Sequence, residues 1–437
     1  MTQTDTTNIF NLNAGQQNAE EVFFKFLFAP EKEMGISGPG GVGKTYLMRA
    51  LIDQTMPRYL ETCAIMGIDP KYEEVNMSAL TNKATSVLAH HIGRPASTIH
   101  SLLGLTVKND YGTGKTKLVR KNNCVPLHGK IIFIDEAFMT DTNLRNEILA
   151  LTPNCKIIYV GDHCQLQPVG ERVSPIYRDQ SIKWAHLTEP MRNAGQPALI
   201  NLCNQVRHTV ETGEFLPIQM VPGVIDHLSD EQMATELEQV FSNQTMDSRV
   251  LAFTNQRVQA INDHIRLLRK LPDEFQIGEL LVNNGAYHSN SGIIPVEEDV
   301  ELLEIGEREL IKLPYGADIT IRRCSIRTGL GYTTDDVRVP VDWNHYQDLM
   351  KWYGKKKDWS TLFQLKETFA DFRQRDAATF HKAQGSTYKS VFIDLGNLSS
   401  CNISDMVARM LYVGVSRAKE RVYFFGSLAS KYGSIIK

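Results

Sequence analysis

Short apolar runs recur along the chain, and each of them ends in a small or acidic residue. They read MGISG, EEVNMSAL, KIIFIDE and KIIYVGD before residue 186, and RVLAFTN, SVFIDLG and RVYFFGS after it. Continuous apolar runs of this length are typical of parallel strands that are buried on both faces. Helix-length segments separate the runs, and a first helix from about Ala14 to Phe28 is predicted by the spacing of Val22, Phe23, Phe26 and Leu27. Alternating strands and helices predict an α/β fold with two sets of parallel strands.

Two segments interrupt this alternation. LTVKNDYGTGKTKLV (105–119) alternates polar and apolar residues around Gly112 and Gly114, which predicts a β-hairpin inserted into the first set. The span from about 276 to 376 carries the strand-like pieces VELLEI, LIKLPY and DITIRR, then a helical, aromatic and basic segment from Trp343 to Arg375. We therefore expect a tail at 1–8, a first domain at 9–185 with the hairpin at about 104–126, a second domain at 186–275 and 377–437, and an inserted subdomain at 276–376.

Composition fits a folded protein of several domains. A chain of 437 residues is too long for one hydrophobic core. Its hydrophobic content is 42%, and no apolar run approaches the roughly 18 residues of a membrane span, so neither a span nor secretion is expected. The seven cysteines form no CxxC pair, which argues against a zinc site or a disulfide framework and favours a reducing compartment. A net charge of -3 means that a polyanionic partner would need a local groove.

The sequence GPGGVGKT (38–45) satisfies the pattern GxxxxGK[ST] between a predicted strand and a predicted helix. Glycines let backbone amides turn toward phosphates, and the helix N-terminus adds its dipole. Lys44 would then reach the β and γ phosphates, while Thr45 would ligate Mg²⁺. A chance glycine-rich turn is the alternative, and its position between strand and helix argues against it.

Two further strand ends carry groups suited to phosphate chemistry. In KIIFIDEA, Asp135 can hold Mg²⁺ through water and Glu136 can polarise the attacking water. In GDHCQLQPV, after Gly161 and Asp162, Gln165 can sense the γ phosphate. Acidic pairs and polar residues at strand ends are also common as caps and turns, and the order of these motifs after the phosphate loop favours the catalytic interpretation.

In this order the motifs resemble those of the superfamily-one group B helicases, the phage Dda-type enzymes related to RecD, over nearly the whole chain. The resemblance implies two RecA-like motor domains with ATP and Mg²⁺ between them and single-stranded DNA across both. It also implies a hairpin wedge and an SH3-like barrel with a helical tower as the two insertions. The residues that it implies for ATP binding are Gln16, which would read adenine, Gly38, Pro39, Gly40, Gly41, Val42, Gly43, Lys44 and Thr45, with Gln384 and Gly385 from the late motif.

The same resemblance implies contacts with DNA. ASTIHSLL (96–103) is similar to motif Ib and offers Ser97, Thr98 and His100, of which His100 could instead be a buried core histidine. SALTNKAT (78–85) is similar to motif Ia and offers Thr81, although it departs from the commoner proline-threonine form. Thr254 and Asn255, after the strand-like RVLAF, complete this group.

Two arginines are candidates for stabilising the charge on a transferring phosphoryl group. LTEPMRNA (187–194) is similar to motif IV and offers Arg192, while LYVGVSRAKERVYFF (411–425) resembles motif VI and offers Arg417. The alternative for each is an ordinary surface arginine.

TFHKAQGS (379–386) resembles motif V, which serves both the nucleotide and the strand. Thr379, His381 and Ser386 can donate to nucleic-acid phosphates, whereas Lys382, Gln384 and Gly385 lie nearer the nucleotide in this interpretation, and which residue serves which ligand stays open. Group A enzymes carry HxAKGxE here, whereas this chain has Gln384 and then Thr387 in place of the glutamate, which implies the RecD-like group and 5′ to 3′ movement. A plain turn into a helix is the alternative.

The insertions offer weaker candidates. Tyr111, flanked by Lys108, Lys115 and Lys117, could meet a duplex junction, or the hairpin could be a solvated loop. KWYGKKKDW (351–359) could touch DNA or a partner, or could be the basic end of an amphipathic helix.

Together these observations predict an ATP-dependent DNA helicase that moves 5′ to 3′ and unwinds duplex or displaces bound proteins. The alternatives are a single-strand-stimulated ATPase that remodels without processive unwinding, and a related RNA helicase; a P-loop small-molecule kinase would leave the second set of strands without a role. Expected partners are single-stranded DNA and duplex junctions, with single-strand-binding or replication proteins as candidates. We expect a monomer in the cytoplasm, that of a bacterial host if the gene belongs to a phage.

Overall fold

The computed structural model describes residues 10–168, 171, 173–189, 196–289, 292–329 and 331–436. It divides into two compact units, Met1–Thr106 with Val119–Ala194 and Val107–Leu118 with Gly195–Lys437. The division at 194/195 lies beyond the boundary expected at 185/186, and the outer part of the hairpin belongs with the second unit.

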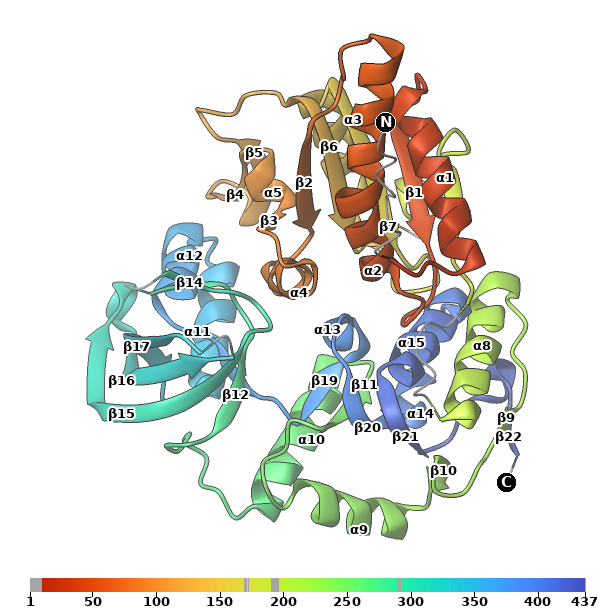
Figure 1. Ribbon diagram of the computed structural model, residues 1–437. Helices are drawn as coiled ribbons and strands as arrows, with labels where there is room; N and C mark the ends of the chain where they lie inside the picture. Colours follow the sequence, from red (N-terminus) through yellow and green to blue (C-terminus); the bar gives the residue numbers. More distant parts are fainter. Residues whose placement is uncertain are drawn as a thin grey trace. The chain divides into compact units, whose positions relative to one another are not determined.

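The first unit is built on a parallel sheet of six strands in the order β3-β2-β6-β7-β1-β8 (Figure 1). The strands are β1 (Glu33–Ser37), β2 (Glu74–Ala79), β3 (Ser97–Thr98), β6 (His128–Asp135), β7 (Asn154–Gly161) and β8 (Lys183–His186). The helices are α1 (Ala14–Phe28), α2 (Lys44–Ala50), which continues through a π-helical turn (Leu51–Thr55) into α3 (Met56–Met66), then α4 (Asn82–Ile92), α5 (Ile99–Leu102), α6 (Thr142–Leu151) and α7 (Pro175–Arg178). The helix expected from Ala14 to Phe28 is confirmed.

Alternation along the strands fixes the core of this unit. Ile131 and Phe133 of β6 belong to one buried cluster with side chains of α1, α2, α3 and α4. Because successive strand residues point to opposite faces, Ile132 and Ile134 face the other side, and they are fully buried too. Both faces of the sheet are thus covered, as the continuous apolar runs predicted.

The second unit contains a parallel five-stranded sheet in the order β10-β21-β20-β11-β19. The strands are β10 (Ile225–Leu228), β11 (Ser248–Ala252), β19 (Ala377–Thr379), β20 (Tyr388–Asp394) and β21 (Ala418–Phe425), with a small separate pair of β9 (Ile218–Gln219) and β22 (Ile435–Ile436). The helices are α8 (Pro197–Thr212), α9 (Asp230–Phe241), α10 (Asn255–Leu268), α13 (Phe380–Ala383), α14 (Leu395–Leu398) and α15 (Ser404–Ser416). The two expected sets of parallel strands are therefore present.

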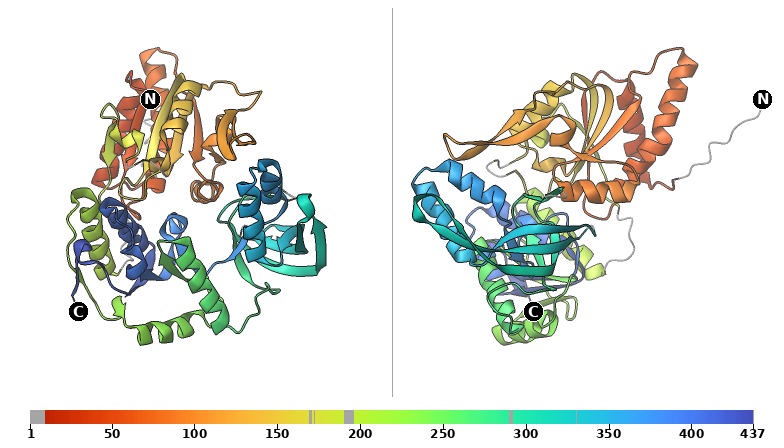
Figure 2. Two further views of the ribbon diagram at one scale, coloured as in Figure 1. Left: turned by 180° about the vertical axis from the view of Figure 1, so that it is seen from behind. Right: turned by 90° about the vertical axis from the view of Figure 1, so that its left-hand side faces the viewer.

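Between β11 and β19 the chain builds an antiparallel sheet in the order β17-β16-β15-β12-β18. The strands are β12 (Leu280–Asn283), β15 (Asp299–Lys312), β16 (Asp318–Thr328), β17 (Thr333–Pro340) and β18 (Phe372–Gln374); a short pair, β13 (Tyr287–Ser289) and β14 (Gly292–Ile294), lies beside them, and the helices are α11 (Trp343–Lys355) and α12 (Trp359–Thr368). The long strands β15 and β16 are teal in Figure 2.

Two expectations about this inserted sheet were wrong. VELLEI and the first three residues of LIKLPY belong to one strand, β15, which ends at Lys312. Register shifts between Leu302 and Glu304 and between Ile305 and Arg308 let the strand continue through this region. A Cβ on Gly306 would lie 2.9 Å from the carbonyl oxygen of Arg323, so glycine permits the close approach at the bend. The helical segment also ends before Arg375, because Phe372–Gln374 returns to the sheet as β18.

The predicted hairpin consists of β4 (Leu105–Asp110) and β5 (Lys115–Arg120). Its outer part packs on α12: the rings of Tyr111 and Phe363 lie edge to face at 5.5 Å, and Asn109 Nδ2 donates to Glu367 Oε1 at 2.6 Å. The right-hand view of Figure 2 shows the orange hairpin beside the blue helix. Within the described parts of the chain, no helix is both long and apolar enough to span a membrane.

Candidate functional site

The loop GPGGVGKT joins β1 to α2 in a shape that leaves space for phosphates. Gly43 caps α2 in the left-handed region at φ 77°, and Gly38 packs so closely that a Cβ would lie 2.5 Å from the carbonyl oxygen of Leu187. A Cβ on Gly40 or Gly41, in contrast, would meet no atom within 4 Å. One side of the loop is therefore packed, and the side around Gly40 and Gly41 is open.

Lys44 stabilises this loop from within. Its Nζ donates to the carbonyl oxygens of Gly38 at 2.8 Å and Pro39 at 3.0 Å, so the ammonium is held over the loop. Thr45 follows in the first turn of α2. This arrangement presents a cation, a hydroxyl and a helix N-terminus together, which is the donor set that a polyphosphate needs.

The acidic pair lies at the end of β6. Burial raises the pKa of Asp135, and the Lys44 ammonium opposes that rise, which places the carboxylate near the loop lysine. The residue after it, Glu136, has a left-handed backbone with φ 52° and ψ 32°. Such a conformation costs of order 1–3 kcal/mol in a residue other than glycine, and it is found where the surroundings hold a side chain in a required direction.

The third strand end, that of β7, contacts the phosphate loop through a backbone hydrogen bond. Gly161, at the end of β7, accepts a hydrogen bond from the Gly38 amide at 3.1 Å, and Gln165 is 5% exposed in the turn that follows. Asp162 is buried there, with Oδ1 accepting from the Cys164 amide at 3.2 Å.

His163 contacts the strand before the phosphate loop, and the sequence analysis did not predict this contact. Its Nδ1 lies 2.8 Å from Oγ of Ser37, the last residue of β1 before the loop, and its ring stacks on Tyr177 at 4.8 Å and 7°. His163 therefore connects the turn after β7 to the strand that leads into the phosphate loop.

Gln16 contacts the phosphate loop directly. Its side chain is fully buried, with Nε2 donating to the Val42 carbonyl at 3.2 Å and Oε1 accepting from the Asn13 amide at 3.1 Å. Its place beside the loop agrees with a position near a nucleotide, and its amide supports the loop in this structure.

Hard oxygen ligands suit Mg²⁺, and the hydroxyl of Thr45 with the carboxylate of Asp135 supplies them beside the open loop. The donor set therefore fits that ion. Among the described residues, one group of three close His, Cys, Asp or Glu ligand atoms exists, Asp162, His163 and Cys164, within 4.8 Å of one another. None of the seven cysteines, all of which lie in the described ranges, forms a disulfide.

The residues expected to touch DNA in the first unit lie at the same edge of its sheet. Ala79, at the end of β2, pairs with both Thr98 and Asp135. Thr81 and Thr98 are N-caps that accept from the amides of Ala84 at 3.2 Å and Ser101 at 3.1 Å.

The neighbouring side chains differ in how they are held. Ser97 is half-buried on β3. Burial lowers the pKa of His100, against a smaller effect of Asp141, so its imidazole is neutral at pH 7 and can contribute a hydrogen bond but no charge.

In the second unit the segment 379–386 begins at the last residue of β19, Thr379. Thr379 caps α13 by accepting from the Lys382 amide at 3.4 Å, and burial lowers the pKa of His381, which keeps that ring neutral. Oε1 of Gln384 is buried and has no hydrogen-bond partner among the described residues, which fits a site that a ligand completes. Gly385 turns the chain at φ 77°.

Arg417 lies directly against this segment. It is 7% exposed, and its guanidinium donates to the carbonyl oxygens of Val413 at 3.2 Å and Ser386 at 3.1 Å and to Oγ of Ser416 at 2.9 Å. Motifs V and VI are therefore one connected site. Arg192 lies outside the described residues.

Thr254 is the N-cap of α10, which begins at Asn255, and Asn397 supports the chain just before the helix. Oδ1 of Asn397 accepts from the amides of Phe253 at 2.8 Å and Thr254 at 2.9 Å, and the hydroxyl of Thr254 caps the helix. In this structure the hydroxyl of Thr254 therefore serves as the helix cap.

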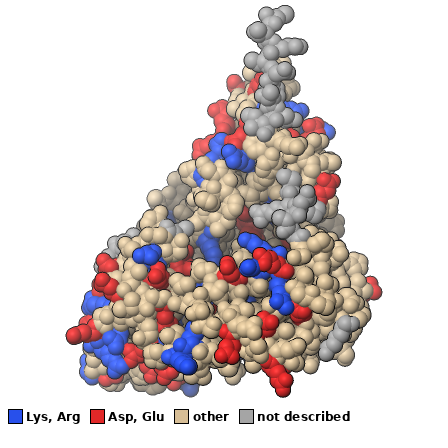
Figure 3. Space-filling model, turned by 60° about the horizontal axis from the view of Figure 1, so that its bottom comes forward, with Lys and Arg blue, Asp and Glu red and all other residues tan. Residues whose placement is uncertain are grey.

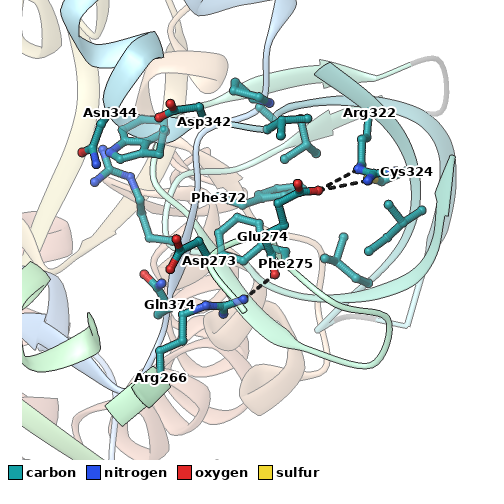
Figure 4. Close-up of a pocket in the computed structure, with 18 of the residues that line it drawn as sticks. Arg266, Asp273, Glu274, Phe275, Arg322, Cys324, Asp342, Asn344, Phe372 and Gln374 are labelled. Carbon is teal, nitrogen blue, oxygen red and sulfur yellow. Dashed lines mark hydrogen bonds and ion pairs between the residues drawn. The ribbon is translucent and has the colours of Figure 1, made fainter. Parts of the chain in front are cut away.

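A cavity of about 520 Å³ lies in the second unit, away from all these motifs (Figure 4). Its walls come from the antiparallel sheet, from α10 and from the start of α11. In those walls Arg322 pairs with the Glu274 carboxylate at 3.0 Å, and Arg266 donates to the backbone carbonyl oxygen of Glu274 at 2.5 Å. On the face drawn in Figure 3, basic and acidic side chains lie interspersed.

Comparisons with known proteins agree with the motifs. Residues 11–216 match the family model of the AAA domain, and residues 376–425 match that of the UvrD-like helicase C-terminal domain. The chain is 26% identical to the ATP-dependent DNA helicase dda of Enterobacteria phage T4, over 95% of this chain and 99% of that protein. It is 24% identical to the ATP-dependent RecD2 DNA helicase of Deinococcus radiodurans, over 90% of this chain and 47% of that one.

Solved structures share the fold. The Pif1 helicase from Bacteroides, in complex with ADP-AlF3 and ssDNA, matches with a TM-score of 0.53 and 13% identity over 98% of this chain and 95% of that chain. The Pif1 helicase from Candida albicans matches with a TM-score of 0.51 and 16% identity over 98% and 97%.

Proposed function

The chain is an ATP-hydrolysing helicase of superfamily one, similar to Dda and RecD, and on this premise we propose that it moves 5′ to 3′ along single-stranded DNA and unwinds duplex. The observation that carries the proposal is that groups suited to binding phosphate lie beside each of the two parallel sheets. The first sheet offers the loop lysine and the acidic pair, and the second offers Arg417 joined to the segment 379–386.

Hydrolysis is assigned to residues of both units. Lys44 binds the β and γ phosphates, Glu136 orients and activates the attacking water, and Gln165 senses the γ phosphate. Mg²⁺, held by Thr45 and through water by Asp135, would neutralise the charge that builds on the phosphates. Arg417 adds a positive charge to the transferring phosphoryl group, and we assign Arg192 the same role on sequence grounds alone.

Strand binding is assigned to threonines that share one local geometry. Thr81, Thr98 and Thr379 follow or end a strand and cap the next helix by accepting a backbone N–H. A hydroxyl that accepts in a cap keeps its own hydrogen, which can donate to a phosphate at the helix N-terminus. Ser97, Asn255 and Ser386 add polar groups, and the neutral rings of His100 and His381 add hydrogen bonds without charge. Contacts of this kind position a strand without reading its bases.

Two assays test this function. A purified helicase of this kind should hydrolyse ATP faster when single-stranded DNA is added, and it should separate a forked duplex. ATPase stimulation without unwinding would instead favour a remodelling ATPase that displaces bound proteins. Stronger stimulation by RNA than by DNA strands of equal length would favour an RNA helicase.

We propose further that the hairpin β4–β5 is a wedge and that the antiparallel sheet with α11 and α12 is an SH3-like barrel with a helical tower. Tyr111 is 58% exposed near the hairpin tip and rests edge-on against Phe363 of α12, so its other faces can meet a base pair. The hairpin is thereby supported from one side.

Replacing Tyr111 with alanine should slow unwinding and leave strand-stimulated ATPase nearly unchanged, because about 1–3 kcal/mol of stacking is lost at the junction only. Forked-duplex separation and ATPase are measured on the same preparations. Val107→Ala, at an equally exposed apolar position on β4, is the matched control and should behave like the unmodified protein. Equal losses in both assays for Tyr111→Ala would exclude the wedge.

A further inference from the structure

Lys382, inside the segment 379–386, is bound by the inserted antiparallel sheet. Its Nζ lies 2.7 Å from Oε1 of Glu297 and donates to Oδ1 of Asn284. Both acceptors belong to the loops that flank β13 and β14, more than 80 residues away along the sequence. The sequence interpretation put Lys382 on the nucleotide side of the segment and left its ligand open; in the structure its ammonium lies against two residues of the inserted subdomain.

The residues that bind Lys382 are themselves held firmly. Asn284 donates from its amide to the Asp371 carbonyl at 2.7 Å and from Nδ2 to Oδ2 of Asp371 at 2.6 Å. Glu297 donates from its amide to the Asn283 carbonyl at 2.7 Å, and the Asn283 side chain is fully buried and donates to the carbonyls of Ile294 and Pro295. Both acceptors are therefore held against the sheet by contacts other than those with Lys382.

The backbone of Glu297 has φ 63°, in the left-handed region that residues other than glycine rarely adopt. Such a conformation persists only where the surroundings determine it. Here the strained residue is the one whose carboxylate meets Lys382, with the two side chains 21% and 29% exposed.

The segment 379–386 is not a stable helix by itself, because α13 is only four residues long, so its orientation depends on contacts with other parts of the chain. It is held from two sides instead. Near its end, Ser386 accepts from the Arg417 guanidinium, and in the middle Lys382 is bound by Glu297 and Asn284. Both contacts act on the residues that serve the strand and the nucleotide in the proposed function.

We propose that the Glu297–Lys382 pair is a positioning contact, through which the inserted subdomain holds the segment 379–386 in the orientation that strand-stimulated ATP hydrolysis requires. The proposal rests on the proposed function and adds a role for the subdomain in the ATPase cycle. Glu297 touches neither nucleotide nor strand in this account; it acts through Lys382.

The test is a double-mutant cycle with Glu297→Gln, Lys382→Gln and both together. ATPase is measured without DNA and with increasing single-stranded oligothymidylate, and thermal unfolding is followed for each variant. We expect each variant to lose about 5- to 10-fold of the stimulation by the strand, with the unstimulated rate and the unfolding temperature close to those of the unmodified protein. Because the pair acts as a unit, the double variant should lose no more than either single variant.

Glu301→Gln is the matched control, since Glu301 pairs with Arg327 at 3.0 Å on the same sheet and touches no part of the segment 379–386. It should retain full stimulation. Full stimulation in Glu297→Gln would overturn the inference, as would losses that multiply in the double variant, which would give Lys382 an independent contact with the strand. An equal fall in the unstimulated rate would make the pair merely structural. If single-stranded DNA does not stimulate the ATPase of the unmodified protein, the proposed function fails together with this inference. The other outcomes concern the variants alone and leave the proposed function intact.

Discussion

Replacing Arg417 with alanine is expected to lower the maximal strand-stimulated ATPase rate by about 10³-fold, with a smaller loss of ATP affinity. The reason is that an arginine stabilises charge that appears only as the phosphoryl group transfers, so its removal affects turnover more than binding. Initial rates over a range of ATP concentrations, with nucleotide binding measured separately, distinguish the two effects.

The surroundings of Arg417 determine the controls for this experiment. Because its guanidinium also supports the Val413 and Ser386 carbonyls, thermal unfolding must be compared with that of Arg421→Ala. Arg421 lies in the strand that follows, β21, and pairs with Asp226 at 2.9 Å. Strand binding without nucleotide should survive in Arg417→Ala. Its loss, with the ATPase chemistry unaffected, would assign Arg417 to the strand groove instead.

Glu136→Gln should preserve ATP binding and slow turnover by about 10²-fold or more. The glutamine keeps the size of the side chain at the strained position but cannot polarise the attacking water, while the contacts of the loop with phosphate remain. Single-turnover hydrolysis and equilibrium binding of a fluorescent ATP analogue measure the two properties. Normal turnover in this variant would remove Glu136 from the catalytic role.

Two further variants serve as comparisons for Glu136→Gln. Lys44→Ala should reduce binding and turnover together, since the ammonium holds the loop carbonyls and, in the proposed function, also binds the phosphates. Glu147→Gln changes a half-buried acid that pairs with Arg120, and it should change neither property. The contrast between Lys44 and Glu136 separates binding from chemistry.

The parallel sheets could be predicted because their central strands are long apolar runs. KIIFIDE and KIIYVGD became β6 and β7, side by side, and the helix from Ala14 to Phe28 had the predicted ends. The short strands β3, β10 and β19 gave no such signal, since two to four residues cannot show a periodicity. Their place depends on pairing with strands that are distant in the sequence.

The site could be predicted only where its residues are adjacent in the sequence. The phosphate loop, the acidic pair and Arg417 were each visible as a local pattern. The contacts of Gln16 with Val42, of His163 with Ser37 and of Lys382 with Glu297 join segments 26 or more residues apart. Nothing in the letters PVEED indicated that Glu297 takes a left-handed backbone and meets motif V.

Direction of movement is the most direct test of the central claim, because it depends on both motor domains and on the assignment of Gln384 and Thr387 to the RecD-like group. Two partial duplexes that differ only in carrying a 5′ or a 3′ single-stranded tail of equal length are mixed with the protein and ATP at low salt, since phosphate contacts weaken steeply as salt rises. We predict that the 5′-tailed duplex is unwound and the 3′-tailed one is not. Unwinding of the 3′-tailed duplex alone would contradict the account of this chain as a 5′ to 3′ helicase.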